Sequence, residues 1–194
     1  MRFESPCAAY LLHLLMGGDS QTLVCLAKAH PADARTMALS DALPLAESSA
    51  LLVPSPMSAR TGRSQSGRES PRCLANTGPR RWAVVEFDFA ADDPCLSCHD
   101  MDSIDACAAL LWALRSRVGR LALVCHSGGK SLHGWFRCWD WEEMYTAEFF
   151  DVAVVHGADP ATRCRAQMVR MPDGRRCNGA RQSVLFFDPA EVAK

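Results

Sequence analysis

The stretch Leu121-Ala-Leu-Val-Cys-His-Ser-Gly-Gly-Lys-Ser-Leu-His-Gly-Trp-Phe-Arg-Cys138 decides the fold expected for this chain. Two apolar runs, 121–125 and 132–138, have the length and composition of buried strands. Between them lies Ser127-Gly-Gly-Lys130, a glycine-rich segment typical of a tight turn. Strands joined by a tight turn are antiparallel, so this stretch predicts a hairpin.

Strands and helices alternate on both sides of this hairpin. The apolar run 82–88 predicts another buried strand, and 51–53, 167–171 and 183–187 predict shorter ones. Residues 102–117 have the spacing of an amphipathic helix, and residues 141–156 are predicted to form a second helix. The interleaving predicts an α+β fold with a mostly antiparallel sheet and flanking helices.

The N-terminal residues carry less information. Apolar spacing at 9–16 and 23–29 is helix-compatible, and the alanine-rich segment 32–50 is compatible with another short helix. We therefore expect a helical appendage of unknown role at 1–50 and a second domain at 51–194. Within that domain, residues 57–80 are rich in Arg, Ser and Gly and predict a long loop.

Composition limits the classes of function. The chain has 194 residues, 48% of them hydrophobic, and a formal net charge of −1, so no global basic field attracts nucleic acid. Contact with a polyanion would have to come from local arginine clusters. Two such clusters are Arg60, Arg63, Arg68, Arg72, Arg80 and Arg81, and Arg163, Arg165, Arg170, Arg175, Arg176 and Arg181.

The ten cysteines are expected to be reduced thiols of a cytoplasmic protein. The apolar run 8–16 is too short to span a bilayer and lacks a signal-like basic region, so no membrane role is expected. Cys95-Leu-Ser-Cys98-His99 matches a haem-attachment pattern, which requires export. A zinc site is not expected there because no second matched pair of cysteines is present.

Glu86 and Asp88 are two positions apart on a predicted strand, so both side chains project from one face. Two neighbouring carboxylates repel unless a cation lies between them, and Mg²⁺ or Mn²⁺ is the natural occupant. A solvent-facing acidic strand end is the alternative. Trp82 and Val84 make the strand look buried, which weakens that alternative.

The segment His126–His133 suits phosphate binding. Consecutive glycines expose backbone N–H groups, Lys130 adds a cation and His133 a donor. A P-loop would require a glycine at Val124 and a helix after Ser131, and neither is present. Further along, Asp159 either completes a carboxylate triad or opens a turn, and Arg170 either binds phosphate or pairs with a local acid.

These motifs, in this order, resemble the archaeo-eukaryotic primase superfamily, and most closely its phage and integrated-element members. The resemblance covers about residues 51–187 and implies a primase-type catalytic core. It implies that Glu86, Asp88 and Asp159 are catalytic and hold two Mg²⁺ or Mn²⁺ ions. It also implies that the nucleotide phosphates are bound by Ser127, Gly128, Lys130, His133 and Arg170.

The chain departs from the family pattern in three places. Glu86 replaces a usual Asp, and Arg170-Met-Pro-Asp173 replaces Arg-Leu-Pro-Gly, so Asp173 is a rival third metal ligand. The insert 94–105 has no family counterpart.

The expected activity is primer synthesis on single-stranded DNA from NTPs or dNTPs, with a replicative helicase as a candidate partner. Two alternatives stay open: a non-catalytic nucleotide- or DNA-binding remnant, and a metal-dependent phosphohydrolase. The choice between an RNA and a DNA product is also open.

Overall fold

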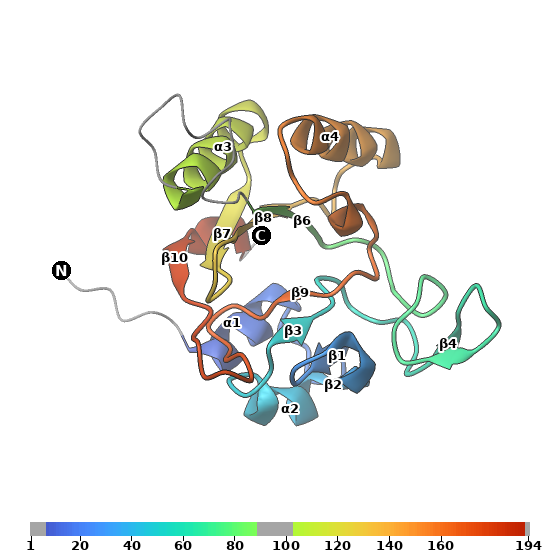
Figure 1. Ribbon diagram of the computed structural model, residues 1–194. Coiled ribbons are helices and arrows are strands. Elements are labelled where there is room, and N and C mark those ends of the chain that lie inside the picture. The colour runs from blue at the N-terminus through green and yellow to red at the C-terminus, as the bar shows by residue number, and fades with distance from the viewer. Residues whose placement is uncertain (1–6, 89–102, 193–194) are drawn as a thin grey trace.

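The computed structural model of the protein describes residues 7–88 and 103–192, and their fold is α+β (Figure 1). The helices are α1 (Ala8–Leu15), α2 (Leu39–Ala42), α3 (Ser103–Val118), α4 (Glu143–Val155) and α5 (Pro189–Val192), with 3-10 turns η1 (Pro31–Asp33), η2 (Leu43–Leu45) and η3 (Pro160–Arg163). The strands are β1 (Leu23–Ala27), β2 (Arg35–Ala38), β3 (Leu51–Leu52), β4 (Gly62–Arg63), β5 (Glu69–Ser70), β6 (Trp82–Phe87), β7 (Leu121–His126), β8 (Leu132–Arg137), β9 (Val169–Arg170) and β10 (Val184–Phe187).

One four-stranded sheet has the order β10-β7-β8-β6, and all of its strand pairs are antiparallel. Both of its faces are buried, which explains why its strands are almost continuously apolar. Ala83, Val85 and Phe87 pack with α3 and α4, whereas Trp82 and Val84 belong to the cluster shared with the N-terminal elements. The predicted hairpin and both predicted long helices are confirmed.

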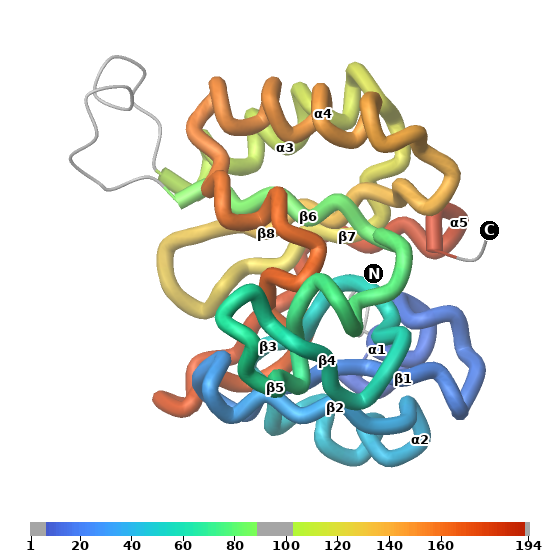
Figure 2. The backbone as a smooth tube through the Cα atoms, turned by 90° about the vertical axis from the view of Figure 1, so that its right-hand side faces the viewer, coloured from blue at the N-terminus to red at the C-terminus, as the bar shows by residue number. Residues whose placement is uncertain are grey.

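The second four-stranded sheet, β2-β1-β3-β9, joins distant parts of the chain. Strand β3 pairs with β1 on one side and with β9, more than a hundred residues downstream, on the other. Figure 2 shows the resulting layers: α3 and α4, then the sheet containing β6–β8, then the N-terminal sheet with α1 and α2. The boundary expected between residues 50 and 51 therefore falls inside a sheet.

The expectation that residues 1–50 form a helical appendage is wrong in part. Residues 23–27 form strand β1 and 35–38 form β2, although the helix expected at 9–16 is present as α1. A short apolar run fits a buried helix and a buried strand equally well, so periodicity could not separate them. Pairing with β2 and β3 decides the outcome, and Val24 to Ala27 are all buried in the sheet.

Helix α1 packs on the central sheet. Its Leu11, Leu12 and Leu15 are fully buried in the cluster that contains Trp82 and Trp135. The Trp82 indole N–H donates a hydrogen bond to the Leu15 carbonyl at 2.8 Å. A buried indole needs such a partner, so this bond fixes the helix to strand β6.

The predicted loop 57–80 contains only the short β4–β5 hairpin as regular structure, and a buried side chain holds its base together. The Asn76 amide accepts a hydrogen bond from the Cys73 backbone N–H at 2.7 Å. It donates to the Pro71 carbonyl at 2.9 Å and to the Ala59 carbonyl at 3.2 Å. One polar side chain thus replaces the missing backbone ladder.

Candidate functional site

The first sequence motif, Glu86-x-Asp88, and the second, His126–His133, meet through Glu86 and His133. Strands β6 and β8 are antiparallel, and their register places these two residues opposite each other. His133 Nε2 lies 3.3 Å from Glu86 Oε1, and the Ser131 hydroxyl donates a hydrogen bond to the same oxygen at 2.8 Å. The His133 side chain is only 2% exposed, and within the described part of the chain its Nδ1 has no hydrogen-bond partner. A buried polar atom in this state calls for a ligand or an ordered water.

The charge state of Glu86 follows from these contacts. Burial raises the pKa of the carboxyl, but the adjacent His133 and the hydrogen bond from Ser131 lower it by more, and the balance is a pKa of about 2. Arg170 adds a smaller lowering contribution. Glu86 is therefore an anion near neutral pH, as a metal ligand or a hydrogen-bond acceptor must be.

A cavity of about 370 Å³ opens where the two sheets meet, and Glu86, His133, Arg170 and Arg176 line it. Arg170 reaches this cavity from β9, which pairs with β3. The third sequence motif, which runs from Asp159 to Arg170, is thereby brought to the same cavity as the first two. Burial and then the neighbouring Arg176 lower the pKa of Arg170, but a guanidinium is basic enough that Arg170 stays charged. Glu86 is the sole acid among the described residues that line this cavity, so cations outnumber anions there.

The turn between β7 and β8 is compact and is held by internal hydrogen bonds. Ser127 N–H donates to the Ser131 carbonyl at 2.9 Å, and Ser131 N–H donates to the Ser127 hydroxyl at 3.2 Å. Gly128 has a φ of +72°, a conformation that disfavours other residues. The chain then enters strand β8, not a helix, so the turn is not a P-loop.

Arg176 is a cavity residue that the sequence motifs missed. A side chain at Gly129 would have its Cβ 3.0 Å from Arg176 Nη1, and one at Gly128 would have it 3.3 Å from Arg176 Cδ. The absence of side chains at both glycines thus lets Arg176 lie against the turn. The signal was present in the sequence as a basic run, but nothing local distinguished Arg176 from Arg175 or Arg181.

Lys130 lies on the outer side of the turn, where its ammonium is 3.2 Å from Asp88 Oδ1. Both side chains are exposed, 66% for Lys130 and 39% for Asp88. An exposed pair of this kind contributes at most about 1 kcal/mol. Asp88 can therefore exchange this partner for another cation at small cost.

Asp159 lies beside the first motif through its backbone. Its N–H donates to the Glu86 carbonyl at 2.9 Å, and Ala158 forms an isolated bridge with Phe87. The Asp159 carboxylate accepts a hydrogen bond from Ala161 N–H at 2.9 Å and so caps η3. The backbone of Asp159 is thus adjacent to Glu86, while the Asp159 carboxylate is hydrogen-bonded within its own turn, η3.

The rival residue Asp173 has a structural partner. It is 3% exposed, and Arg181 donates to its two carboxylate oxygens at 2.6 and 2.9 Å. A buried carboxylate held by a two-pronged guanidinium is already satisfied.

Within the described residues, no three His, Cys, Asp or Glu side chains are grouped so that they could hold a metal ion. Glu86 and Asp88 nevertheless offer only oxygen donors, the type that Mg²⁺ and Mn²⁺ prefer. Their present partners are a hydroxyl and an imidazole for Glu86 and a surface ammonium for Asp88. Cys95, Cys98 and His99, discussed for zinc, lie outside the described residues.

The search among known proteins returned no match: no family model, no curated protein and no solved structure matches this chain. In the described ranges, none of the helices combines the length and apolarity needed to cross a membrane.

Proposed function

We propose that the protein is a metal-dependent nucleotidyltransferase of the primase type, which makes primers on single-stranded DNA during phage or mobile-element replication. One observation carries the proposal. Glu86 of the first motif and His133 of the second lie 3.3 Å apart and line a single cavity with Arg170 of the third. The three motifs on which the primase resemblance rests thus each contribute a residue to one cavity. That cavity is cationic and suits a nucleoside triphosphate.

The residues of the cavity and of the turn between β7 and β8 have distinct roles in this proposal. Arg170, Arg176 and Lys130 neutralise the triphosphate of an incoming NTP or dNTP, and His133 donates a hydrogen bond to it. In the turn, the N–H groups of Ser127 and Gly128 already donate to the Ser131 carbonyl and to His126 Nδ1, so the N–H groups of Gly129 and Lys130 would supply the further donors. Binding here fixes the α-phosphate for in-line attack, so catalysis is mostly positioning and charge stabilisation.

Glu86 and Asp88 would hold the divalent cation, with Asp159 as the third ligand that the family resemblance implies. A bound Mg²⁺ or Mn²⁺ supplies charge neutralisation at the reacting phosphates. In the reaction, the 3′ oxygen of the strand forms a bond to the α-phosphorus while the bond to the β-phosphate oxygen breaks. Pyrophosphate leaves, and the hydroxyl proton passes to solvent.

Primer synthesis on single-stranded DNA, with labelled NTPs or dNTPs and Mn²⁺, tests the proposal. We expect Asp88→Ala to lower product formation by at least about 100-fold, because it removes a group that acts on the transition state. Asp41→Ala, on the exposed side of α2, is the matched control and should retain full activity. Undiminished synthesis by Asp88→Ala would refute the catalytic assignment.

A second candidate is a nucleotide- or DNA-binding remnant without turnover. Its supporting observation is that Glu86, Asp88 and Asp159 each already have a partner within the protein. This candidate predicts nucleotide binding that His133→Ala weakens, and no product with any divalent metal. Phosphate release without chain extension would instead indicate a phosphohydrolase.

A further inference from the structure

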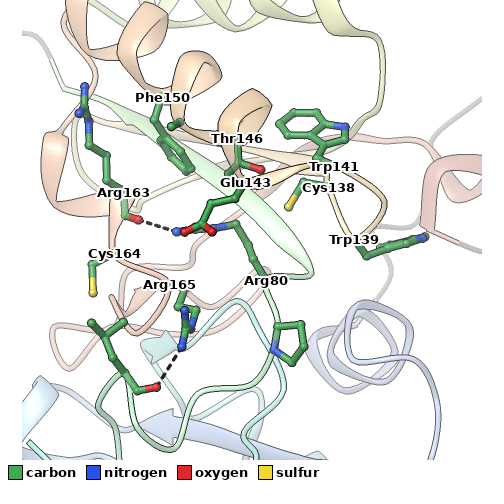
Figure 3. Close-up of a pocket in the computed structure, with 13 residues that line it drawn as sticks. Arg80, Cys138, Trp139, Trp141, Glu143, Thr146, Phe150, Arg163, Cys164 and Arg165 are labelled. Carbon is green, nitrogen blue, oxygen red and sulfur yellow. Dashed lines mark hydrogen bonds between the residues drawn. The ribbon is translucent and has the colours of Figure 1, made fainter.

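A second and larger cavity, of about 750 Å³, lies at the β6 edge of the central sheet, outside the proposed catalytic site (Figure 3). Its walls come from the segment that leads into β6, the segment after β8, helix α4 and turn η3. No residue lines both cavities. The residues of this larger cavity are therefore not accounted for by the proposed catalytic site.

Two arginines give this cavity unbalanced positive charge. In the described parts of the chain, neither Arg80 nor Arg165 has a carboxylate within ion-pair distance. Arg80 donates to the Arg163 carbonyl and Arg165 to the Leu74 carbonyl, as the dashed lines of Figure 3 show. Arg165 Nε is buried without a hydrogen-bond partner among the described residues.

Burial and the positive charge of Arg165 both lower the pKa of Arg80, although Cys138 and Cys164 act in the opposite direction. Two guanidinium groups that are partly desolvated near each other are costly unless an anion joins them. Glu143 is the only acid among the described residues lining the cavity, and it is exposed on the first turn of α4. One carboxylate leaves an excess of positive charge.

The opposite wall is aromatic. Trp139, Trp141 and Phe150 line the cavity, and in Figure 3 the ring of Trp139 points away from Arg80. Arg80 lies 4.9 Å from the centre of the Phe150 ring. Trp141 is held by edge contacts with Tyr145 and Phe149, at 5.0 and 5.1 Å between ring centres, and so is preorganised. Cationic groups beside aromatic rings suit a phosphate attached to a base.

We propose that this cavity binds one nucleotide of a single DNA strand, with its phosphate on Arg80 and Arg165 and its base against Trp141. A strand is favoured over a free nucleotide because the chain segment that supplies Arg80 carries further exposed arginines. The segment 57–80 that supplies Leu74 and Arg80 also forms the β4–β5 hairpin, which projects from the body of the molecule in Figure 1. That hairpin region exposes Arg60, Arg63 and Arg68.

The proposal rests on the proposed function only in calling the strand a template. Binding itself requires neither a metal nor Asp88. Fluorescence anisotropy with a labelled oligo-dT strand in EDTA therefore tests it separately from catalysis. Asp88→Ala should bind the strand as the unchanged protein does, even if it makes no primers.

We expect Arg80→Ala and Arg165→Ala to weaken strand binding by about 10-fold or more, and Trp141→Ala by about 5-fold or more. Each arginine variant should also reduce the slope of log K against log salt by about 0.7, whereas Trp141→Ala should leave it unchanged. Arg117→Ala, an exposed position on α3, is the control and should have little effect.

Glu143→Gln gives the sharpest outcome, because removing the cavity's carboxylate should tighten strand binding, which a damaged fold cannot do. Binding that is unchanged in Arg165→Ala and no tighter in Glu143→Gln overturns the proposal. Equal weakening by Asp88→Ala would tie strand binding to the Glu86-x-Asp88 motif and not to this cavity, and also overturns the proposal. If dTTP displaces the labelled oligo-dT strand at a concentration equal to that of the strand's nucleotides, the cavity does not prefer a strand to a free nucleotide. That result overturns the choice of a strand.

Discussion

Glu86 shows how three side chains set the charge of one group. It is about three-quarters buried, which by itself favours the neutral acid, yet His133 and Ser131 reverse that preference and lower its pKa to about 2. The lowered pKa means that the folded state favours the carboxylate more than the unfolded state does. The favourable contribution is thus complete above pH 4.5 and disappears as pH falls toward 2.

We therefore predict that the free energy of unfolding of the unchanged protein exceeds that of Glu86→Gln most strongly above pH 5. The difference should shrink by on the order of 3 kcal/mol between pH 5 and pH 2, since each pKa unit corresponds to about 1.4 kcal/mol. Urea unfolding at several pH values measures it, with Glu148→Gln on the exposed face of α4 as control. A difference that stays constant with pH would contradict the lowered pKa.

At the scale of elements, Gly134 determines how closely α3 packs on strand β8. A Cβ at this position would lie 2.4 Å from Leu111 Cδ2 and 3.2 Å from Phe136 Cε2. Leu111 is 1% exposed and belongs to the cluster formed by α3, α4 and the sheet. The glycine thus allows a helix–sheet contact for which any larger residue is too big.

Gly134→Ala is predicted to destabilise the protein by about 1–3 kcal/mol through overpacking. Because the clash is with Leu111, the same substitution in a Leu111→Ala background should cost at least about 1 kcal/mol less. Thermal or denaturant unfolding of the four proteins of this cycle supplies the measurement. Strict additivity of the two changes would show that the helix–strand contact is not where the strain arises.

At the scale of the whole molecule, the candidate catalytic cavity exists only because two sheets meet. Glu86 and His133 come from the central sheet, and Arg170 comes from β9 at the edge of the N-terminal sheet. Strand β3 connects β9 to β1. The N-terminal residues, which carry no chemical motif, are thereby part of the scaffold that positions the third motif.

We predict that residues 51–194 alone lack cooperative unfolding, because removing 1–50 leaves β3 without β1 and uncovers Trp82 and Trp135. Tryptophan emission should shift to longer wavelength, and a dye that binds apolar surface should bind the fragment. Supplying residues 1–50 as a separate chain should restore part of the intact spectrum. A cooperative transition of the fragment alone, with the emission of the intact chain, would disprove the structural role.

Local sequence determined the central elements of this protein. The apolar strands around residues 82–87 and 121–137, the glycine turn between β7 and β8, and the helices α1, α3 and α4 all follow from patterns a few residues long. The same patterns predicted Glu86 and His133 as candidate site residues, because the alternation of a strand and the residue types of a turn can both be recognised within a few consecutive residues.

Tertiary structure alone decided the rest. Residues 23–27 became a strand because β2 and β3 lie on either side of them, and no local period specifies such partners. Arg176 entered the cavity because Gly128 and Gly129 leave space for it. The cavity of Arg80 and Arg165 brings together segments more than eighty residues apart. Pairings over such distances depend on which buried surfaces fit one another, a property of the whole chain that no short pattern contains.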